Sequence, residues 1–185
     1  MKAPHRVLGG LTIMRVLEMV TPFKWQHFFP ETTAEDWAPH RQWLEPDALD
    51  PDTDQLQFPM QSYVVRTSHH TILIDSCVGN NKDRPTRPHW HLKTDQTYLN
   101  ALAAHGIAPE AIDFVMCTHL HSDHVGWNTR LENGRWVPTF PNARYVFSKK
   151  ELEAWRDVGH EKFSRTPFED SVLPVLEAGR AELVA

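Results

Sequence analysis

The sequence predicts an α/β fold in which helices cover a mixed or parallel β-sheet. Residues 71–77 (TILIDSC) and 112–117 (IDFVMC) are typical of buried strands, and an amphipathic helical pattern lies between them. Residues 142–147 (NARYVF) have the same character and lead directly into a second helical pattern. Strand–helix–strand order favours parallel strands, with the connecting helices packed on the faces of the sheet.

The composition is that of a globular protein with an acidic balance. The 185 residues include 19 Lys plus Arg against 24 Asp plus Glu, which gives a net charge of -5 and argues against a nucleic-acid partner. The first apolar stretch, residues 7–20, is interrupted by Arg15 and Glu18, so it predicts neither a signal peptide nor a membrane span. Two cysteines are too few for a disulfide framework. We therefore expect a cytoplasmic protein with no membrane partner.

The N-terminal third is expected to begin with a strand and to continue as an ordered arm. Residues 11–20 (LTIMRVLEMV) combine β-branched and other apolar side chains, which predicts the strand. Between about residues 21 and 58, prolines break any long element and large aromatic side chains supply apolar surface. These aromatic residues are Trp25, Phe28, Phe29, Trp37 and Trp43. We expect them to serve in the core or in a homodimer contact, with Trp25 and Phe28 as alternative candidates for a substrate pocket. The arm is predicted to belong to a single domain that spans residues 1–185.

A hairpin, an irregular loop and a helix are predicted next. Residues 62–67 (SYVVRT) and 71–77 flank a short turn, so they are expected to pair as two strands. The segment 78–88 is rich in Gly, Asn and Pro, which predicts irregular backbone. Thr94 or Asp95 can then cap a helix that ends at Gly106. The apolar stripe of this helix is predicted to be Tyr98, Leu99, Leu102 and Ala103.

The last third is expected to contain two helices and a final strand. Ser148 is the predicted N-cap of a helix that begins KKELEAW, and Glu151 completes a capping box three residues later. Residues 169–177 predict a further helix that Pro174 limits or breaks. Residues 181–185 (AELVA) have a strand-like pattern.

The chemistry is expected to centre on the segment THLHSDHVGW, which directly follows the strand 112–117. In extended backbone, side chains two residues apart lie on the same side, so His119 and His121 can point at one metal ion. Asp123 and His124 come after the chain begins to turn, which lets them face a second ion. Imidazole nitrogens with one carboxylate oxygen suit zinc, with iron, manganese or cobalt as substitutes. The alternative is a surface histidine cluster at the end of a strand.

This segment resembles the metal motif of the metallo-β-lactamase superfamily. The wider run IDFVMCTHLHSDHVGWN, with TILIDSCVG before it and ARYVFSKKELEAW after it, is similar to the lactonase and methyl-parathion-hydrolase-like branch, over about residues 60 to 185. The resemblance implies an αββα sandwich. It places His119 and His121 on the first metal ion, and Asp123 and His124 on the second.

The same resemblance requires further ligands from later sequence. The family uses a third histidine on the first metal, a bridging aspartate and a last histidine on the second metal. His160, in the segment DVGHEKF, does not resemble the family's later Gly-His motif. We therefore expect the chain to correspond to the first half of the sandwich plus part of its middle. Such a chain is expected to bind metal weakly or not at all by itself.

Other polar residues have weaker assignments. Asp75, at the end of the strand 71–77, resembles a carboxylate that braces the metal loop, and the alternative is a plain strand-end cap. His89 and His91 form a second H-x-H pattern in a proline-rich loop. No carboxylate ligand is expected nearby, which favours pocket lining or a surface position over metal binding.

The expected function is that of a zinc-dependent hydrolase with two ions in the complete enzyme. The two metals would share a hydroxide, formed from water of lowered pKa, that attacks a carbonyl or phosphoryl centre. Asp123 would hold the second metal and orient this nucleophile. Lactones, esters and phosphotriesters fit the chemistry, and the aromatic arm favours a hydrophobic small-molecule substrate. The alternative is a non-catalytic binding or assembly module that retains half of the hydrolase fold, which the missing ligands favour.

Overall fold

The computed structural model describes residues 5–157 and 166–185, so His160 lies outside the described part of the chain. It divides into two compact units. One unit contains Met1–Glu18 and Gln61–Ala185, and the other contains Met19–Met60. The bounds of the second unit lie close to those of the predicted arm.

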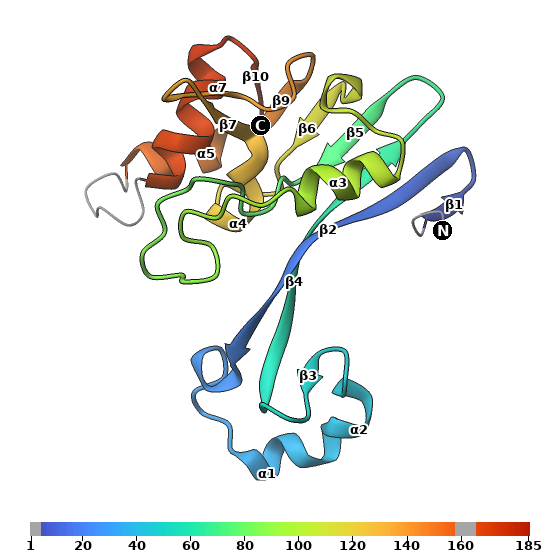
Figure 1. The fold of residues 1–185 in the computed structure, drawn as a ribbon, viewed down its shortest axis with the longest axis vertical. Helices are drawn as coiled ribbons and strands as arrows, with labels where there is room; N and C mark the ends of the chain where they lie inside the picture. The colour runs from blue at the N-terminus through green and yellow to red at the C-terminus, as the bar shows by residue number, and fades with distance from the viewer. Residues whose placement is uncertain (1–4, 158–165) are drawn as a thin grey trace. The chain divides into compact units, whose positions relative to one another are not determined.

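An eight-stranded mixed sheet organises the fold (Figure 1). Its strand order is β1-β2-β4-β5-β6-β9-β10, and β3 pairs with β4 off this path. The strands are β1 (His5–Leu8), β2 (Leu11–Lys24), β3 (Leu49–Asp50), β4 (Gln55–Arg66), β5 (Thr71–Ile74), β6 (Phe114–Met116), β9 (Arg144–Ser148) and β10 (Ala181–Val184). Strands β5, β6, β9 and β10 are parallel to one another, whereas β4 runs antiparallel to β5. The predicted mixed sheet and the predicted hairpin are both confirmed.

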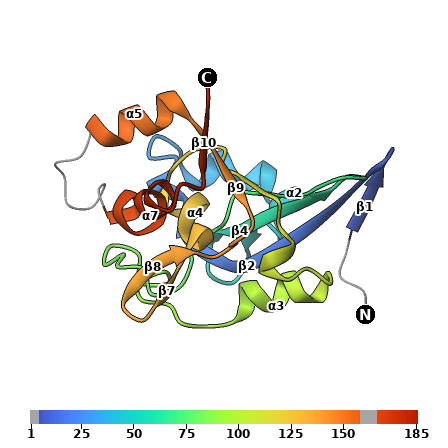
Figure 2. The same cartoon turned by 90° about the horizontal axis from the view of Figure 1, so that it is seen from above.

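Helices connect the parallel strands, as the strand–helix–strand pattern predicts. Helix α3 (Thr97–Ala104) lies between β5 and β6, and helices α5 (Lys149–Asp157) and α7 (Leu173–Glu177) lie between β9 and β10. Leu102 of α3 and Val175 of α7 are buried in the same core cluster as strand residues of β5, β6 and β9, and Figure 2 shows α3 and α7 as separate helices beside the sheet. Among the described residues, no helix combines the length and apolar character needed to span a bilayer.

The main hydrophobic core lies between these helices and the parallel strands. Leu73, Val115 and Tyr145 from the strands are buried, as are Leu102 of α3 and Val175 of α7. The predicted stripe of α3 is confirmed for Tyr98 and Leu102 and, in part, for Leu99, but Ala103 is exposed. The core thus fixes the strand ends from which the functional segments emerge.

The segment between β6 and β9 folds as short elements. Helix α4 (Ser122–Val125) is followed by the 3-10 turn η4 (Gly126–Asn128) and by the hairpin of β7 (Thr129–Glu132) and β8 (Arg135–Pro138).

Another short 3-10 turn, η3 (Pro109–Ala111), precedes β6. After α5, a π-helical turn η5 (Phe168–Val172) leads into α7. Pro174 occupies the first turn of α7, so it marks a helix start where the sequence predicted a limit or a break.

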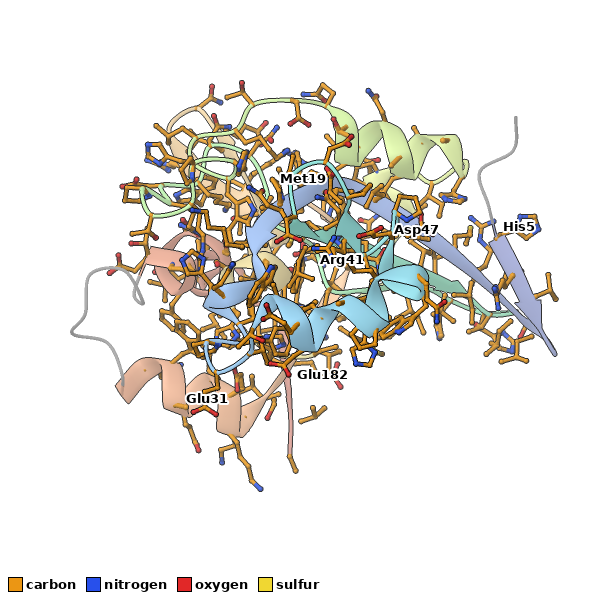
Figure 3. All side chains as sticks on the ribbon, turned by 90° about the horizontal axis from the view of Figure 1, so that it is seen from below. His5, Met19, Glu31, Arg41, Asp47 and Glu182 are labelled. Carbon is orange, nitrogen blue, oxygen red and sulfur yellow. The ribbon has the colours of Figure 1, made fainter. Side chains whose placement is uncertain are left out.

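The unit Met19–Met60 has a small aromatic core of its own. Between β2 and β3 it contains η1 (Trp25–His27), α1 (Ala34–Trp37), η2 (Ala38–His40) and α2 (Arg41–Leu44). Trp25, Leu49 and Leu56 are buried together, and the Trp25 ring lies 5.3 Å from that of Trp37. Met19, Glu31, Arg41 and Asp47 mark the course of this unit in Figure 3.

Several boundaries differ from the sequence prediction. The first strand continues to Lys24, four residues beyond the predicted end, because its pairing with β4 keeps the backbone extended past Pro22. Strand β1 was missed, since the Gly9–Gly10 turn separates only four residues from β2. The amide of Glu151 does approach Ser148 Oγ, at 3.5 Å, but the Glu151 carboxylate accepts hydrogen bonds elsewhere, from Leu120 and Trp155. The second half of the predicted capping box was therefore wrong.

Two glycines bring the loop after β5 into close contact with the 3-10 turn η4. A Cβ atom added at Gly126 would lie 2.0 Å from the carbonyl carbon and oxygen of Val78. Gly79 has a φ of +76°, and a Cβ there would lie 2.5 Å from the Gly126 carbonyl carbon. Only residues without a Cβ allow the two backbones to approach this closely.

We predict that Gly126→Ala lowers the free energy of unfolding by about 1–3 kcal/mol, because the added methyl overlaps backbone that has no room to move. Gly10→Ala is the matched control, since no atom lies within 4 Å of its added Cβ. Urea denaturation of both variants measures the difference. Equal stability losses in the two variants would contradict the close-approach explanation.

A buried ionic cluster joins the loop after β5 to the η5 turn. Lys82 Nζ donates to Thr129 Oγ1 at 2.7 Å and to the Asp170 carbonyl oxygen at 2.9 Å, and it lies 3.6 Å from the centre of the Trp136 ring. The Arg84 guanidinium forms a two-point ion pair with the Asp170 carboxylate, at 2.8 and 2.9 Å. Burial lowers the pKa of Lys82 to about 7, although Asp170 opposes the shift.

Lys82 predicts a pH dependence of stability. Between pH 7 and about 10.5 the unfolded chain binds the Lys82 proton and the folded chain has released it, so this group makes unfolding harder as the pH rises. Its slope is at most about 1.4 kcal/mol per pH unit, and below pH 7 it disappears because both states are protonated. Wild type should therefore gain stability relative to Lys82→Met across this window in urea denaturation. Parallel pH profiles would refute the assignment, and exposed Lys149→Met is the control.

Candidate metal centre

The histidine-rich segment lies on a bend and a short helix at the carboxyl end of β6 (Figure 1). Strand β6 ends at Met116, so His119 and His121 do not lie in extended strand as the sequence reasoning assumed. His121 is the N-cap of α4, and Asp123 and His124 lie within that helix. The bend after β6, together with the start of α4, therefore brings the side chains together.

Three imidazole rings converge in this segment. The centre of the His119 ring lies 4.6 Å from that of His121 and 3.9 Å from that of His124. His124 Nε2 lies 3.5 Å from Asp123 Oδ2. All four predicted metal ligands are thus linked in one cluster by contacts between neighbouring members.

Asp75 joins the end of β5 to this cluster. Its Oδ1 accepts a hydrogen bond from the Thr118 amide at 2.8 Å, and its Oδ2 lies 2.9 Å from His124 Nδ1. The Thr118 hydroxyl also donates to Asp75 and lies 3.0 Å from His119 Nδ1. With Nδ1 of both His119 and His124 in contact with neighbouring oxygens, their Nε2 atoms remain as donors for a metal.

Backbone hydrogen bonds fix the same region. The amide of Ser76 donates to the His124 carbonyl at 2.8 Å, and the amide of Gly126 donates to the Cys77 carbonyl at 2.7 Å. Asp75 and Cys77 have φ values of 57° and 50°, in the left-handed region that L residues rarely adopt. The hydrogen bonds of this region stabilise that conformation, which turns the Asp75 carboxylate toward the histidine-rich segment.

The electrostatics of the cluster differ between its histidines. Burial and the neighbouring imidazoles of His124 and His121 lower the pKa of His119, which favours the neutral form that binds metal. Burial opposes a charged His124, but the hydrogen bond to Asp75 and the charge of Asp123 raise its pKa overall. The carboxylates therefore act mainly on His124.

Helix α5 contributes two residues that sequence reasoning did not assign to the site. Glu151 Oε1 accepts hydrogen bonds from the Leu120 amide at 3.1 Å and from Trp155 Nε1 at 2.9 Å. The Trp155 ring is edge-on to His121, with 5.7 Å between ring centres. The four-residue spacing of Glu151 and Trp155 predicts that the two side chains meet on one helix face. The contact with Leu120 depends on tertiary packing and has no local sequence signal.

The donor types of the cluster fit zinc. Imidazole nitrogens and one carboxylate are its usual ligands, and two of the rings are already oriented through Nδ1. Among residues 5–157 and 166–185, no group of three or more His, Cys, Asp or Glu side chains has the arrangement of a metal site. The described residues thus supply the donors without a complete coordination sphere.

The other predicted site residues lie apart from these contacts. His89 and His91 are exposed, and His91 Nδ1 accepts from the Arg84 amide at 3.1 Å and lies 3.3 Å from Asp83 Oδ1. The expectation that no carboxylate lies near this pair was therefore wrong.

The two aromatic pocket candidates belong to the unit Met19–Met60. Trp25 is buried in its core and donates to Asp54 at 3.0 Å, and half-exposed Phe28 stacks on Phe58 with 4.9 Å between ring centres. The same unit contains an apolar cavity of about 600 Å³. Its aromatic lining is formed by Phe29, Trp37, Trp43 and Phe58.

Comparisons with known proteins identify a family for this chain and structures with a similar fold. Residues 57–183 match the family model of the Metallo-beta-lactamase superfamily. A probable metal-dependent hydrolase from Staphylococcus aureus is similar in structure, with a TM-score of 0.72, 18% identity, and coverage of 97% of this chain and 60% of that one. The dizinc quorum-quenching lactonase AidC, solved with the product N-hexanoyl-L-homoserine, has a TM-score of 0.71, 16% identity, and coverage of 98% and 60%.

The hydrolase AbOPH of the beta lactamase superfamily has a TM-score of 0.69, 20% identity, and coverage of 97% and 60%. This chain therefore spans about 60% of the length of each of these three structures. No curated protein matches the chain. The predicted fold class is confirmed by these likenesses.

We predict that Asp75→Asn lowers the pKa of His124 in the metal-free protein, because the variant loses both the hydrogen bond and the charge that stabilise the protonated ring. NMR titration of the histidine ring resonances measures the change. Asp83→Asn is the control, since that carboxylate contacts His91 in an exposed pair. An unchanged His124 titration in Asp75→Asn would show that Asp75 does not control this ring.

Proposed function

Starting from the membership of this chain in the metallo-beta-lactamase superfamily, we propose that it forms part of a zinc-dependent hydrolase whose metal ligands include His119, His121, Asp123 and His124. The observation that supports the proposal most is the convergence of three imidazole rings beside one carboxylate at the end of a buried parallel strand. Two bound ions would supply Lewis acidity and a water of lowered pKa.

The residues of this chain would prepare the ligands before metal arrives. Asp75 holds His124 through Nδ1, and Thr118 contacts His119 through Nδ1, so each ring presents Nε2. His119 has a lowered pKa, which reduces the proton competition for its nitrogen. Asp123 lies beside His124 Nε2, where its second oxygen can accept a proton from the attacking nucleophile and orient it.

The proposed substrates are lactones, esters or phosphotriesters with an apolar group. The relative AidC was solved with an acylated homoserine product, which favours a lactone for this chain as well. The apolar group is proposed because the N-terminal third of the chain is rich in aromatic side chains. We place the protein in the cytoplasm, and we retain a homodimer as the proposed assembly.

The test is hydrolysis by the full-length protein, stripped of metal and reloaded with zinc, cobalt or manganese. An N-acyl homoserine lactone, an aryl ester and a phosphotriester are the substrates. We predict that His121→Ala lowers kcat/KM by about 100-fold or more, because a ligand is lost. His69→Ala, in an exposed turn, should retain wild-type activity.

Turnover that survives both exhaustive chelation and His121→Ala would contradict a metal-dependent reaction. A full-length protein that folds as a monodisperse species, binds no zinc and hydrolyses none of the three substrates would instead indicate the non-catalytic module.

A further inference from the structure

Helix α5 supports the histidine-rich segment in addition to Asp75 and independently of it. The described hydrogen bonds of the Asp75 carboxylate reach Thr118 and His124, and Thr118 extends that support to His119. His121, which follows Leu120 in the sequence, contacts Trp155 of α5.

Glu151 acts on the backbone between the two first ligands. The amide that it binds belongs to the peptide bond between His119 and Leu120. That peptide unit is planar, so one hydrogen bond restricts the orientation of the whole plane. The Leu120 side chain is itself buried, with 1% of its surface exposed. Core packing therefore holds the Leu120 side chain, and the Glu151 carboxylate holds the Leu120 amide. Because His121 is the next residue, both contacts restrict the position of its ring.

Trp155 acts on the ring of His121. Its indole lies edge-on to the imidazole, at an interplanar angle of 82°, and it packs on the main core through its other contacts. Glu151 Oε1 fixes the indole orientation through Nε1 at 2.9 Å. The same carboxylate oxygen thus accepts from Leu120 and from Trp155, which couples the backbone and the ring of the ligand segment.

We propose that Glu151 and Trp155 are positioning residues that orient His121 for metal binding, with one carboxylate oxygen joining α5 to the ligand segment. The inference rests on the proposed metal-dependent function. Neither residue is a ligand: both act through His121 and the peptide before it. The two supports divide the work, because Asp75 orients His124 and His119 while α5 orients His121.

The test compares zinc affinity and the cobalt absorption spectrum in the full-length protein. Glu151→Ala removes the shared acceptor, so it should weaken zinc binding by about 10- to 100-fold and alter the cobalt spectrum. Glu151→Gln keeps a carbonyl oxygen that can accept both hydrogen bonds, so it should recover most of the affinity. Glu153→Ala, an exposed change on the same helix, should match wild type.

Trp155→Leu provides a second variant if Glu151→Ala does not fold. It removes the indole edge but leaves the Glu151–Leu120 hydrogen bond in place, so we expect an altered cobalt spectrum and an affinity loss toward the lower end of the same range. Thermal unfolding of the metal-free proteins serves as the structural readout.

Wild-type affinity and an unchanged cobalt spectrum in Glu151→Ala, with only a lower unfolding temperature, would overturn this inference and leave the proposed function intact. The same result in Trp155→Leu would overturn it if Glu151→Ala does not fold. A wild-type full-length protein that binds no metal would overturn the proposed function itself, and this inference with it.

Discussion

The carboxylate of Asp75 is the contact on which the arrangement of the candidate site depends. Asp75 lies at the end of β5, and its carboxylate binds Thr118 and His124 in the segment after β6. The end of one parallel strand therefore fixes the segment that follows the neighbouring strand. The position requires left-handed backbone at Asp75, and hydrogen bonds between residues 76–77 and 124–127 hold the strand end in that conformation. The same strained turn allows Gly79 and Gly126 to touch.

The candidate site has an inner and an outer support, and the Asp75 contact belongs to the inner one. The inner support consists of Asp75 and Thr118, which contact the Nδ1 atoms of His124 and His119. The outer support consists of Glu151 and Trp155, on a helix that follows β9. Because β5, β6 and β9 are parallel neighbours, their carboxyl ends meet at one edge of the sheet, where both supports reach the same short segment.

Much of this arrangement could be predicted from the sequence, since its signals are local. Apolar runs and turn residues located β5, β6 and β9, and the spacing of the histidines located the candidate ligands. The predictions that were wrong concern contacts that depend on tertiary packing. The histidines converge through a bend where alternation along a strand was assumed. The Glu151 carboxylate, expected to complete a capping box, binds Leu120 and Trp155, because packing of α5 on the ligand segment offered it two better-placed donors.

The most direct measurement is anomalous diffraction at the zinc edge from crystals of the full-length protein grown with zinc. We predict zinc about 2.0–2.1 Å from Nε2 of His119 and from a ring nitrogen of His121, with a second ion on Asp123 and His124, while His124 Nδ1 still contacts Asp75. Imidazole rings that point apart, with no anomalous density between them, would contradict it.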